Sequence, residues 1–179
     1  LGIGFVGGGF ITRFHIQSMI GVRDCEVLGV MSKTKSSAEE SVALAKSLGL
    51  GDAKVFKSVT EMVSEPDIDA LWICAPNFTR VEIIEEIVFA IESGKGNLVG
   101  ITCEKPLGRN VEEAKKVLDL TQKVDLLDGY LENQVFAPSV TRGKEIIWAR
   151  GAKTTGRPYL ARAAEEHSGP HMPWFWEGE

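Results

Sequence analysis

The chain contains LGIGFVGGGFIT at residues 1–12, and this stretch decides the fold. Residues 1–6 form a short apolar run of the kind that builds a β-strand. Residues 10–20 carry apolar side chains at helical spacing, which predicts a helix with one face packed on a sheet. A strand, a glycine-rich turn and a helix are therefore expected in direct succession.

The turn fits the spacing GxGxxG at its first two glycines. Gly7 would make the sharp turn, and Gly9 would let the backbone approach a pyrophosphate. The amides of Gly9, Phe10 and Ile11 would then face this anion at the helix N-terminus. Thr12 stands at the third position and is bulkier than the usual glycine or alanine. The motif predicts a dinucleotide site, and the alternative is a turn that binds nothing.

Short apolar runs alternate with amphipathic stretches along most of the chain, which is typical of a parallel sheet covered by helices on both faces. Strands are expected at 1–6, 26–31, 54–56, 68–74 and 97–103 and from Leu126 onward. Helices are expected at 10–20, from a Ser36-Ser37 cap to near Gly49, and at 60–64, 80–93 and 111–123, the last after an Asn110 cap. We predict an α/β fold, with a doubly wound Rossmann domain over residues 1–137.

Composition excludes several classes of function. The 179 residues are 44% apolar and 25% charged, with a formal net charge of -5 and no stripe of Lys and Arg that could follow a phosphate backbone. We therefore expect no nucleic-acid partner. No apolar run approaches the roughly 20 residues needed to cross a bilayer, and the start lacks a secretory pattern. We expect a cytoplasmic protein without a membrane partner.

The three cysteines are odd in number and far apart, and they form no CxxC pair and no Cys/His cluster. We interpret them as reduced, buried apolar residues. We expect no metal site.

The residues after the second strand bear on the choice of nicotinamide cofactor. An acidic side chain there would bind the ribose hydroxyls of NAD, whereas this chain has Ser32-Lys33-Thr34. Ser32 and Lys33 would bind and neutralise a 2'-phosphate, so we favour NADP over NAD. The alternative is that Lys33 is merely solvated.

A second motif, Glu104-Lys105-Pro106, follows the predicted strand at 97–103. This is the sheet edge where open α/β folds bind their ligands. Pro106 keeps Lys105 out of helical geometry. The lysine ammonium could then hydrogen-bond a substrate hydroxyl and favour its alkoxide form. The alternative is an ordinary exposed loop lysine.

With these motifs the chain resembles the glucose-fructose oxidoreductase, inositol dehydrogenase and MocA family of nicotinamide-dependent enzymes. Four segments carry the resemblance in the expected order, at residues 4–11, 75–77, 103–107 and 132–138. It implies that Lys105 is the catalytic residue beside nicotinamide and substrate. It also implies that Ala75, Pro76 and Asn77 line the cofactor and that Glu104 and Asn133 hold the nicotinamide ribose region. Where many members have a histidine shortly after the Pro-Asn pair, this chain has Arg80.

The resemblance further implies that residues 138–179 begin a second α+β domain. We expect a linking helix at 138–150 and a strand at 159–164 leading into it. In the family this domain is an open, mostly antiparallel sheet that covers the substrate, often forms the homo-oligomer interface, and carries an acid-base histidine preceded by an aspartate. We expect the chain to be a fragment that lacks this pair and binds cofactor with little turnover.

The tail at residues 165–176 packs two histidines and three large aromatic residues together. His167, His171 and Trp174 could contact a polyhydroxylated ligand, or the aromatics could seal an interface. The intervening Gly169-Pro170 imposes no helical spacing on the histidines, which argues against a metal. His15, on the first helix, is expected to be a packing residue close to the cofactor.

The function implied is an NAD(P)-dependent oxidoreductase that transfers hydride between NADP or NAD and a sugar, polyol or related hydroxy or carbonyl compound. Two alternatives stay open. One is an NAD-dependent glycosidase of the same architecture, and the other is a catalytically silent nucleotide-binding regulatory subunit.

Overall fold

A computed structural model describes residues 1–164, 166, 168 and 169. The chain divides into two compact units, which meet between Glu132 and Asn133. The first unit thus ends before Ala137, where the sequence predicts the end of the Rossmann domain. The two units are described separately below.

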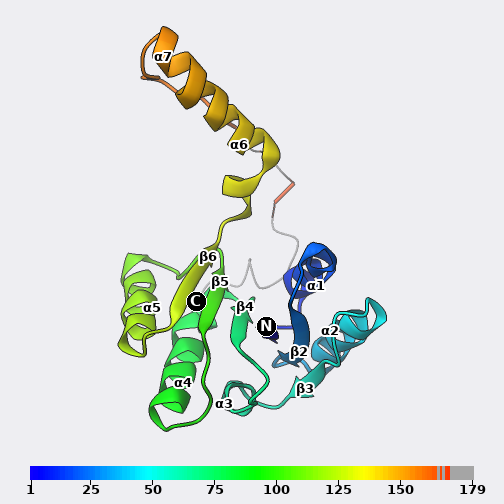
Figure 1. The fold of residues 1–179 in the computed structure, drawn as a ribbon. Helices are drawn as coiled ribbons and strands as arrows, with labels where there is room; N and C mark the ends of the chain where they lie inside the picture. The colour runs from blue at the N-terminus through cyan, green and yellow to red at the C-terminus, as the bar shows by residue number, and fades with distance from the viewer. Residues whose placement is uncertain (165, 167, 170–179) are drawn as a thin grey trace. The chain divides into compact units, whose positions relative to one another are not determined.

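The first unit is built on a six-stranded sheet in the order β3-β2-β1-β4-β5-β6, shown in Figure 1, and all strand pairs are parallel. The strands are β1 (Gly2–Val6), β2 (Glu26–Met31), β3 (Lys54–Phe56), β4 (Ala70–Ile73), β5 (Gly100–Glu104) and β6 (Leu127–Leu131). The direction of winding reverses between β1 and β4. The prediction of a doubly wound sheet is confirmed, and the carboxyl ends of β1 and β4 flank its switch point.

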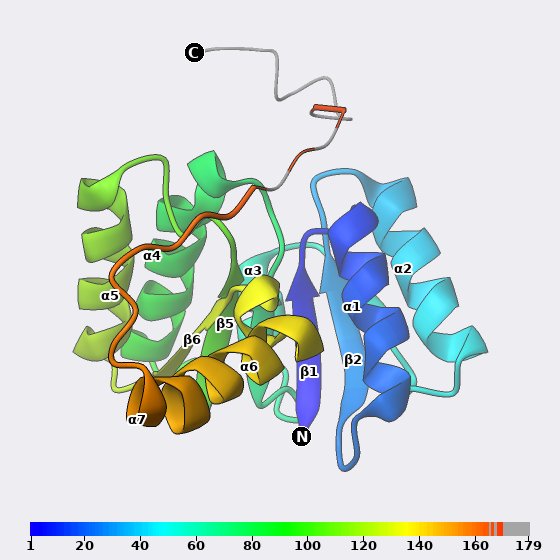
Figure 2. The ribbon, with the colours of Figure 1, turned by 90° about the horizontal axis from the view of Figure 1, so that it is seen from above.

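Helices cover both faces of this sheet (Figure 2). The helices α1 (Phe10–Ser18) and α2 (Lys35–Ser47) share one apolar core with β1 and β2, which includes Ile3, Phe5 and Ile16. The helices α3 (Val59–Val63), α4 (Arg80–Glu92) and α5 (Val111–Lys123) share another on the opposite face. Short turns of 3-10 helix, η1 (Met19–Gly21) and η2 (Asn77–Thr79), follow α1 and precede α4.

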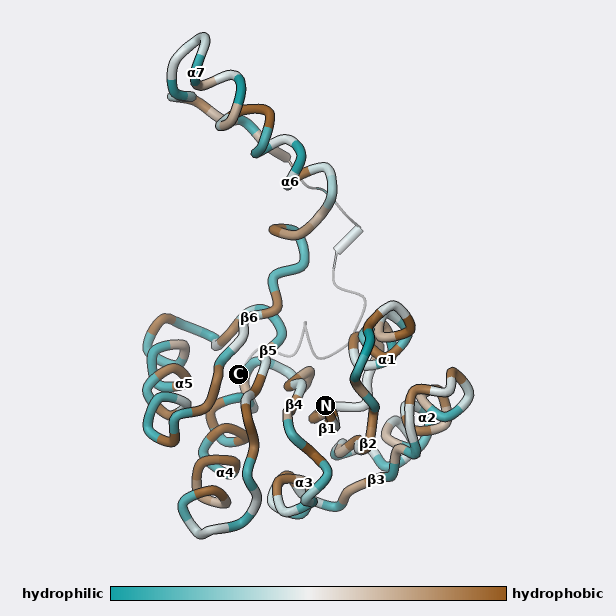
Figure 3. The backbone as a smooth tube through the Cα atoms, viewed as in Figure 1, coloured by the Kyte–Doolittle hydropathy of each residue, from teal (hydrophilic) through white to brown (hydrophobic). Residues whose placement is uncertain are grey.

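Side-chain alternation assigns each strand residue to one of these two cores. Phe5 of β1 and Trp72 of β4 belong to the core under α1 and α2, whereas Val6 and Ile73 belong to the core under α4. Hydrophobic and hydrophilic residues alternate along α4 and α5 in Figure 3, as expected for helices with one buried side. The central strands β1, β4 and β5 are therefore largely buried on both faces, which explains their continuous apolar runs, whereas the edge strands β3 and β6 are more exposed.

One predicted helix start is confirmed and another is wrong. Asn110 caps α5, because its side-chain oxygen accepts a hydrogen bond from the amide of Glu113 at 2.9 Å. In contrast, α2 begins at Lys35, and its N-cap Thr34 makes no side-chain cap bond. Ser36 and Ser37 lie inside the first turn, where the backbone of Ser37 packs against Gly8. This tertiary contact sets the helix start in place of a serine cap.

Two strands are shorter than the apolar runs that predicted them. β4 begins at Ala70 rather than Ile68, and β5 begins at Gly100 rather than Asn97. Ile68 and Leu98 are buried in the core ahead of the paired segments. An apolar run in the sequence therefore predicts which residues are buried, and only some of these residues form the hydrogen bonds of a strand.

The second unit is helical where it is regular. It contains η3 (Asn133–Phe136), α6 (Pro138–Glu145), the π-helical η4 (Ile146–Gly151) and α7 (Ala152–Thr154). The helix predicted at 138–150 is confirmed. The strand predicted at 159–164 is wrong, because residues 156–164 have no regular structure and Tyr159 is 98% exposed. A strand needs a neighbour to pair with, and this segment pairs with none of the described strands.

Candidate active site

The turn after β1 needs glycine at its first position. Gly7 has a φ of 108°, and a Cβ atom there would lie 2.8 Å from the backbone nitrogen of Ala75. The Gly7 amide donates to the carbonyl of Met31 at 2.7 Å. The turn is thereby held between the ends of β2 and β4, at the switch point of the sheet.

Gly9 has a different role, because it leaves space. A Cβ atom on Gly9 would meet nothing within 4 Å. Gly9 is the N-cap of α1 and makes no side-chain cap bond, and no acidic residue occupies the first turn. The first amides of α1, from Phe10 onward, thus lie at the positive end of a helix whose first turn contains no acidic side chain. An open cradle with uncapped amides fits a dinucleotide pyrophosphate.

Thr12, the residue that departs from the glycine motif, is fully buried beneath the turn. Its hydroxyl donates to the carbonyl of Gly7 at 2.8 Å. The larger residue therefore fits because its hydroxyl fixes the turn from below. Burial raises the pKa of the neighbouring Cys74 thiol to about 12, against the lowering effect of its hydrogen bond with Thr12. The Cys74 thiol is protonated at neutral pH and is not a nucleophile.

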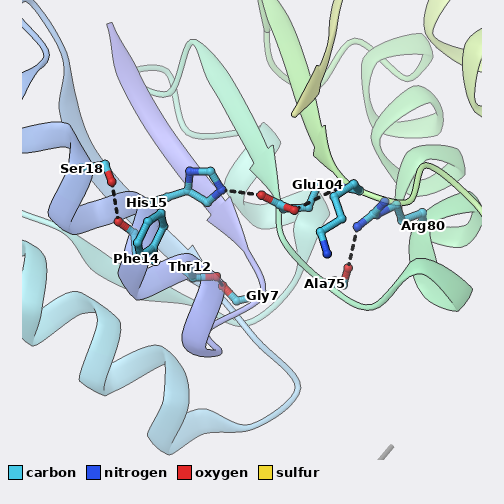
Figure 4. Close-up of polar contacts among 9 residues, drawn as sticks. Gly7, Thr12, Phe14, His15, Ser18, Ala75, Arg80 and Glu104 are labelled. Atoms are coloured by element: carbon cyan, nitrogen blue, oxygen red, sulfur yellow. Dashed lines mark hydrogen bonds and ion pairs between the residues drawn. The ribbon is translucent and has the colours of Figure 1, made fainter. Parts of the chain in front are cut away.

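Glu104 ends β5 and is almost fully buried, and it faces the helix that follows the glycine turn. Its Oε1 lies 2.7 Å from Nε2 of His15 on α1, as Figure 4 shows. Its Oε2 accepts a hydrogen bond from the backbone amide of Lys105 at 3.1 Å. Burial acts to raise the pKa of Glu104. The hydrogen bond with His15, the electrostatic attraction to His15 and the hydrogen bond from the Lys105 amide together hold this pKa below its ordinary value. The Glu104 carboxyl is therefore ionised at neutral pH.

Lys105 is exposed immediately after β5, and its peptide bond to Pro106 is cis. Arg80 of α4 holds this turn from the other face of the sheet. Arg80 is 2% exposed, and its guanidinium donates to the carbonyl of Pro106 and, at 3.4 Å, to the carbonyl of Ala75. Burial lowers the pKa of Arg80, which still carries its charge at neutral pH. Arg80 thus ties the loop after β4 to the turn after β5.

The structure brings most of the predicted site residues to one edge of the sheet. Ala75, Pro76 and Asn77 follow β4 and are partly buried, and Ala75 contacts the glycine turn. Ser32 and Lys33 follow β2, and Lys33 is exposed while Ser32 accepts a bond from the Thr34 amide at 3.3 Å. Because carboxyl ends of parallel strands meet at one edge, these loops surround the glycine turn.

Other predicted residues lie elsewhere. Asn133 begins η3 in the second unit and is exposed. His167, His171 and Trp174 lie outside the described residues. The ligand contacts expected of these four residues stay predictions.

The sequence does not predict two of the contacts at this site. It predicts His15 only as a packing residue close to the cofactor, and Arg80 only as a departure from the family. Each makes its contact with a residue far along the chain, 89 positions away for His15 and 26 for Arg80. The topology is the signal that could have found the first pair, because α1 and the end of β5 meet at the same edge of the sheet.

Among the residues that the structure describes, no group of three or more His, Cys, Asp or Glu side chains could hold a metal ion. No described helix combines the length and the apolar character needed to cross a membrane.

The chain is similar in sequence to known proteins that include a reductase and a dehydrogenase. The chain is 31% identical over 159 residues to 1,5-anhydro-D-fructose reductase from Ensifer adhaerens, covering 89% of this chain and 43% of that protein. It is 25% identical over 168 residues to myo-inositol 2-dehydrogenase from Thermotoga maritima, covering 94% and 46%. The chain thus spans less than half the length of these relatives.

A solved structure and a family model also match this chain. GenD2 from gentamicin A biosynthesis, in complex with NAD, matches 85% of this chain and 40% of its own at a TM-score of 0.70, and its 22% identity speaks for the fold alone. The model of an oxidoreductase family with an NAD-binding Rossmann fold matches residues 1–127, well over half of the chain. The chain therefore belongs to the glucose-fructose oxidoreductase, inositol dehydrogenase and MocA family of oxidoreductases.

Proposed function

We propose that the chain is the cofactor-binding part of an NAD(P)-dependent oxidoreductase acting on a sugar, polyol or related hydroxy or carbonyl compound. The names of its relatives, a reductase of anhydrofructose and a dehydrogenase of myo-inositol, support this substrate class. The observation that carries the proposal is an exposed lysine at the end of β5, at the same sheet edge as an open glycine cradle.

The described residues divide the binding work. The amides of Gly9, Phe10 and Ile11 would bind the pyrophosphate, since they start α1 beside open space. Ala75, Pro76 and Asn77 would line the cofactor next to this turn. Glu104 and Asn133 would hold the nicotinamide ribose, and His167, His171 and Trp174 would contact the substrate.

Lys105 is the residue proposed to act on the substrate. Its ammonium would donate a hydrogen bond to the reacting hydroxyl or carbonyl oxygen and stabilise negative charge that develops there. When bound, the nicotinamide supplies or accepts the hydride. A general acid or base must also move the hydroxyl proton, and we expect it from a second domain of the whole enzyme. The homo-oligomer and the cytoplasmic location stay predictions.

The lysine role is tested with Lys105→Ala in the whole enzyme that contains this chain. We expect the affinity for NADH to change less than about threefold and kcat to fall about 10²- to 10⁴-fold, the usual contribution of a positioned proton donor. Lys115→Ala, at an exposed position on α5, is the matched control. A Lys105→Ala enzyme that reduces its carbonyl substrate as fast as the wild type would contradict the mechanism.

We further propose that the chain prefers NADP. Lys33 is exposed after β2, where its ammonium could meet a ribose 2'-phosphate, and Ser32 stands beside it. Replacing Lys33 by glutamate should weaken NADPH binding about tenfold or more and leave NADH binding within about threefold. Titration of the wild type with both cofactors tests the preference, and tight NADH with weak NADPH would overturn it.

A further inference from the structure

His15 and Glu104 form a contact that crosses the switch point of the sheet. His15 lies in α1, which follows β1, and Glu104 ends β5. The sheet order places β4 between β1 and β5, so the two side chains meet across the carboxyl end of β4. In Figure 4 the ring of His15 points directly at the Glu104 carboxylate. The contact thus joins α1, which follows the glycine turn, to the end of β5, and these two elements are proposed to hold opposite parts of the cofactor.

The direction of the hydrogen bonds follows from the charge of Glu104. An ionised carboxylate only accepts, so Nε2 of His15 donates at 2.7 Å. The second oxygen of Glu104 accepts from the backbone amide of Lys105 at 3.1 Å. The two side chains are only 20% and 11% exposed, so water has little access to replace these bonds. One carboxylate therefore connects α1 to the backbone of Lys105.

We infer that His15 is a positioning residue, which acts through Glu104 to fix the nicotinamide end of the site relative to the pyrophosphate end. This inference rests on the proposed function. Helix α1 links the two ends of the site. It begins with the uncapped amides proposed to bind the pyrophosphate, and it presents His15 five residues after Phe10. A helix rises about 1.5 Å per residue, so α1 sets a spacing of about 7.5 Å along its axis between these features.

A contact that only stabilises the fold would behave differently. Its loss would lower the melting temperature and affect all ligands alike. A positioning contact affects the part of the ligand that it serves. ADP-ribose contains the pyrophosphate but no nicotinamide, so it reports on the glycine cradle alone. The ratio of the dissociation constants of NADH and ADP-ribose therefore separates the two roles.

The test compares four variants of the chain by titration with NADH and with ADP-ribose. His15→Asn is too short to reach Glu104, and His15→Phe keeps the ring but lacks the donor. His15→Gln places an amide N–H near the position of Nε2, and Gln17→Ala changes an exposed neighbour on α1 as the control.

We expect His15→Asn and His15→Phe to weaken NADH binding on the order of tenfold and ADP-ribose binding less than about twofold. His15→Gln should recover NADH binding to within about threefold of the wild type. The control Gln17→Ala should bind both ligands as the wild type does. Either of the two disruptive variants is sufficient if the other does not fold. As a measurement without ligand, amide hydrogen exchange at Lys105 should quicken in the disruptive variants and stay unchanged in Gln17→Ala.

Each other outcome has a distinct meaning. A wild type that binds ADP-ribose and NADH, with variants that lose both equally or neither, overturns the positioning role of His15 alone. Failure of His15→Gln to recover NADH binding also overturns it. A wild type that binds neither ADP-ribose, nor NADH, nor NADPH overturns the proposed function and the inference with it.

Discussion

The turn after β1 and the turn after β5 lie at the same edge of the sheet but are built in opposite ways. The first depends on two glycines that carry no side chain, since Gly7 contacts the backbone of Ala75 and Gly9 leaves open space. The second is shaped by polar side chains, with His15 holding Glu104 from one face and Arg80 holding Pro106 from the other. Backbone shape creates room for an anion, and charged side chains fix a lysine beside it.

The largest effect is expected where the first turn is broken. Gly7→Ala should destabilise the protein by about 3–5 kcal/mol, because the new Cβ meets backbone atoms at 2.8 Å and its φ of 108° strains any other residue. Urea unfolding followed by circular dichroism measures this.

Gly9→Ala is the matched control for that variant, since its Cβ meets no protein atom within 4 Å. It should change stability by no more than about 0.5 kcal/mol. It should still weaken NADH binding, because the methyl group occupies space that the ligand needs. Equal destabilisation by both variants would contradict the distinction between a packed and an open glycine.

The second turn is broken from the α4 face by Arg80→Met. We expect a loss of about 2–3 kcal/mol in unfolding free energy, because the carbonyls of Ala75 and Pro106 lose their donor. Lys116→Met, which removes an exposed pair with Glu85, should cost less than about 1 kcal/mol. If Arg80→Met proved as mild as Lys116→Met, Arg80 would not hold the turn.

The turn after β1 can be predicted from the sequence more completely than the turn after β5. Gly7, Gly9 and Thr12 lie within six consecutive residues after an apolar run, so their pattern is local and predicts both strand and helix. Helix α5 was predicted with its correct limits for the same reason, because the Asn110 cap adjoins it. The contacts of His15 and Arg80 depend on which side chains and carbonyl groups of distant segments face one another within that fold, which no local pattern encodes. The α2 start and the 159–164 strand failed because neighbours far along the chain decide them.

A smaller effect is expected at Thr12, which belongs to the first turn but uses a side chain. Thr12→Val keeps the shape and removes the hydroxyl that donates to Gly7 at 2.8 Å. The cost should be about 1–2 kcal/mol, since a buried carbonyl is left without a partner, and Thr12→Ser should recover most of it. Thermal unfolding of both variants checks this, and a Thr12→Val protein as stable as the wild type would show that the hydrogen bond is dispensable.

The smallest effect concerns pH and distinguishes the charged turn from the glycine turn. Because contacts with His15 and the Lys105 amide lower the folded-state pKa of Glu104, its carboxylate stabilises the fold above its ordinary pKa of 4.5. This contribution is lost as the pH falls from 4.5 through the lowered pKa. The stability difference between wild type and Glu104→Gln should shrink over that range, as measured by unfolding at several pH values. A constant difference would contradict the assignment.

The central claim is that the two turns bind one nicotinamide dinucleotide between them. A crystal structure of the chain with NADPH tests it most directly. We expect the pyrophosphate to contact the amides of Gly9 to Ile11 and the nicotinamide to lie beside Glu104 and Lys105. A dinucleotide bound away from the glycine turn, or one whose nicotinamide points away from Lys105, would contradict it.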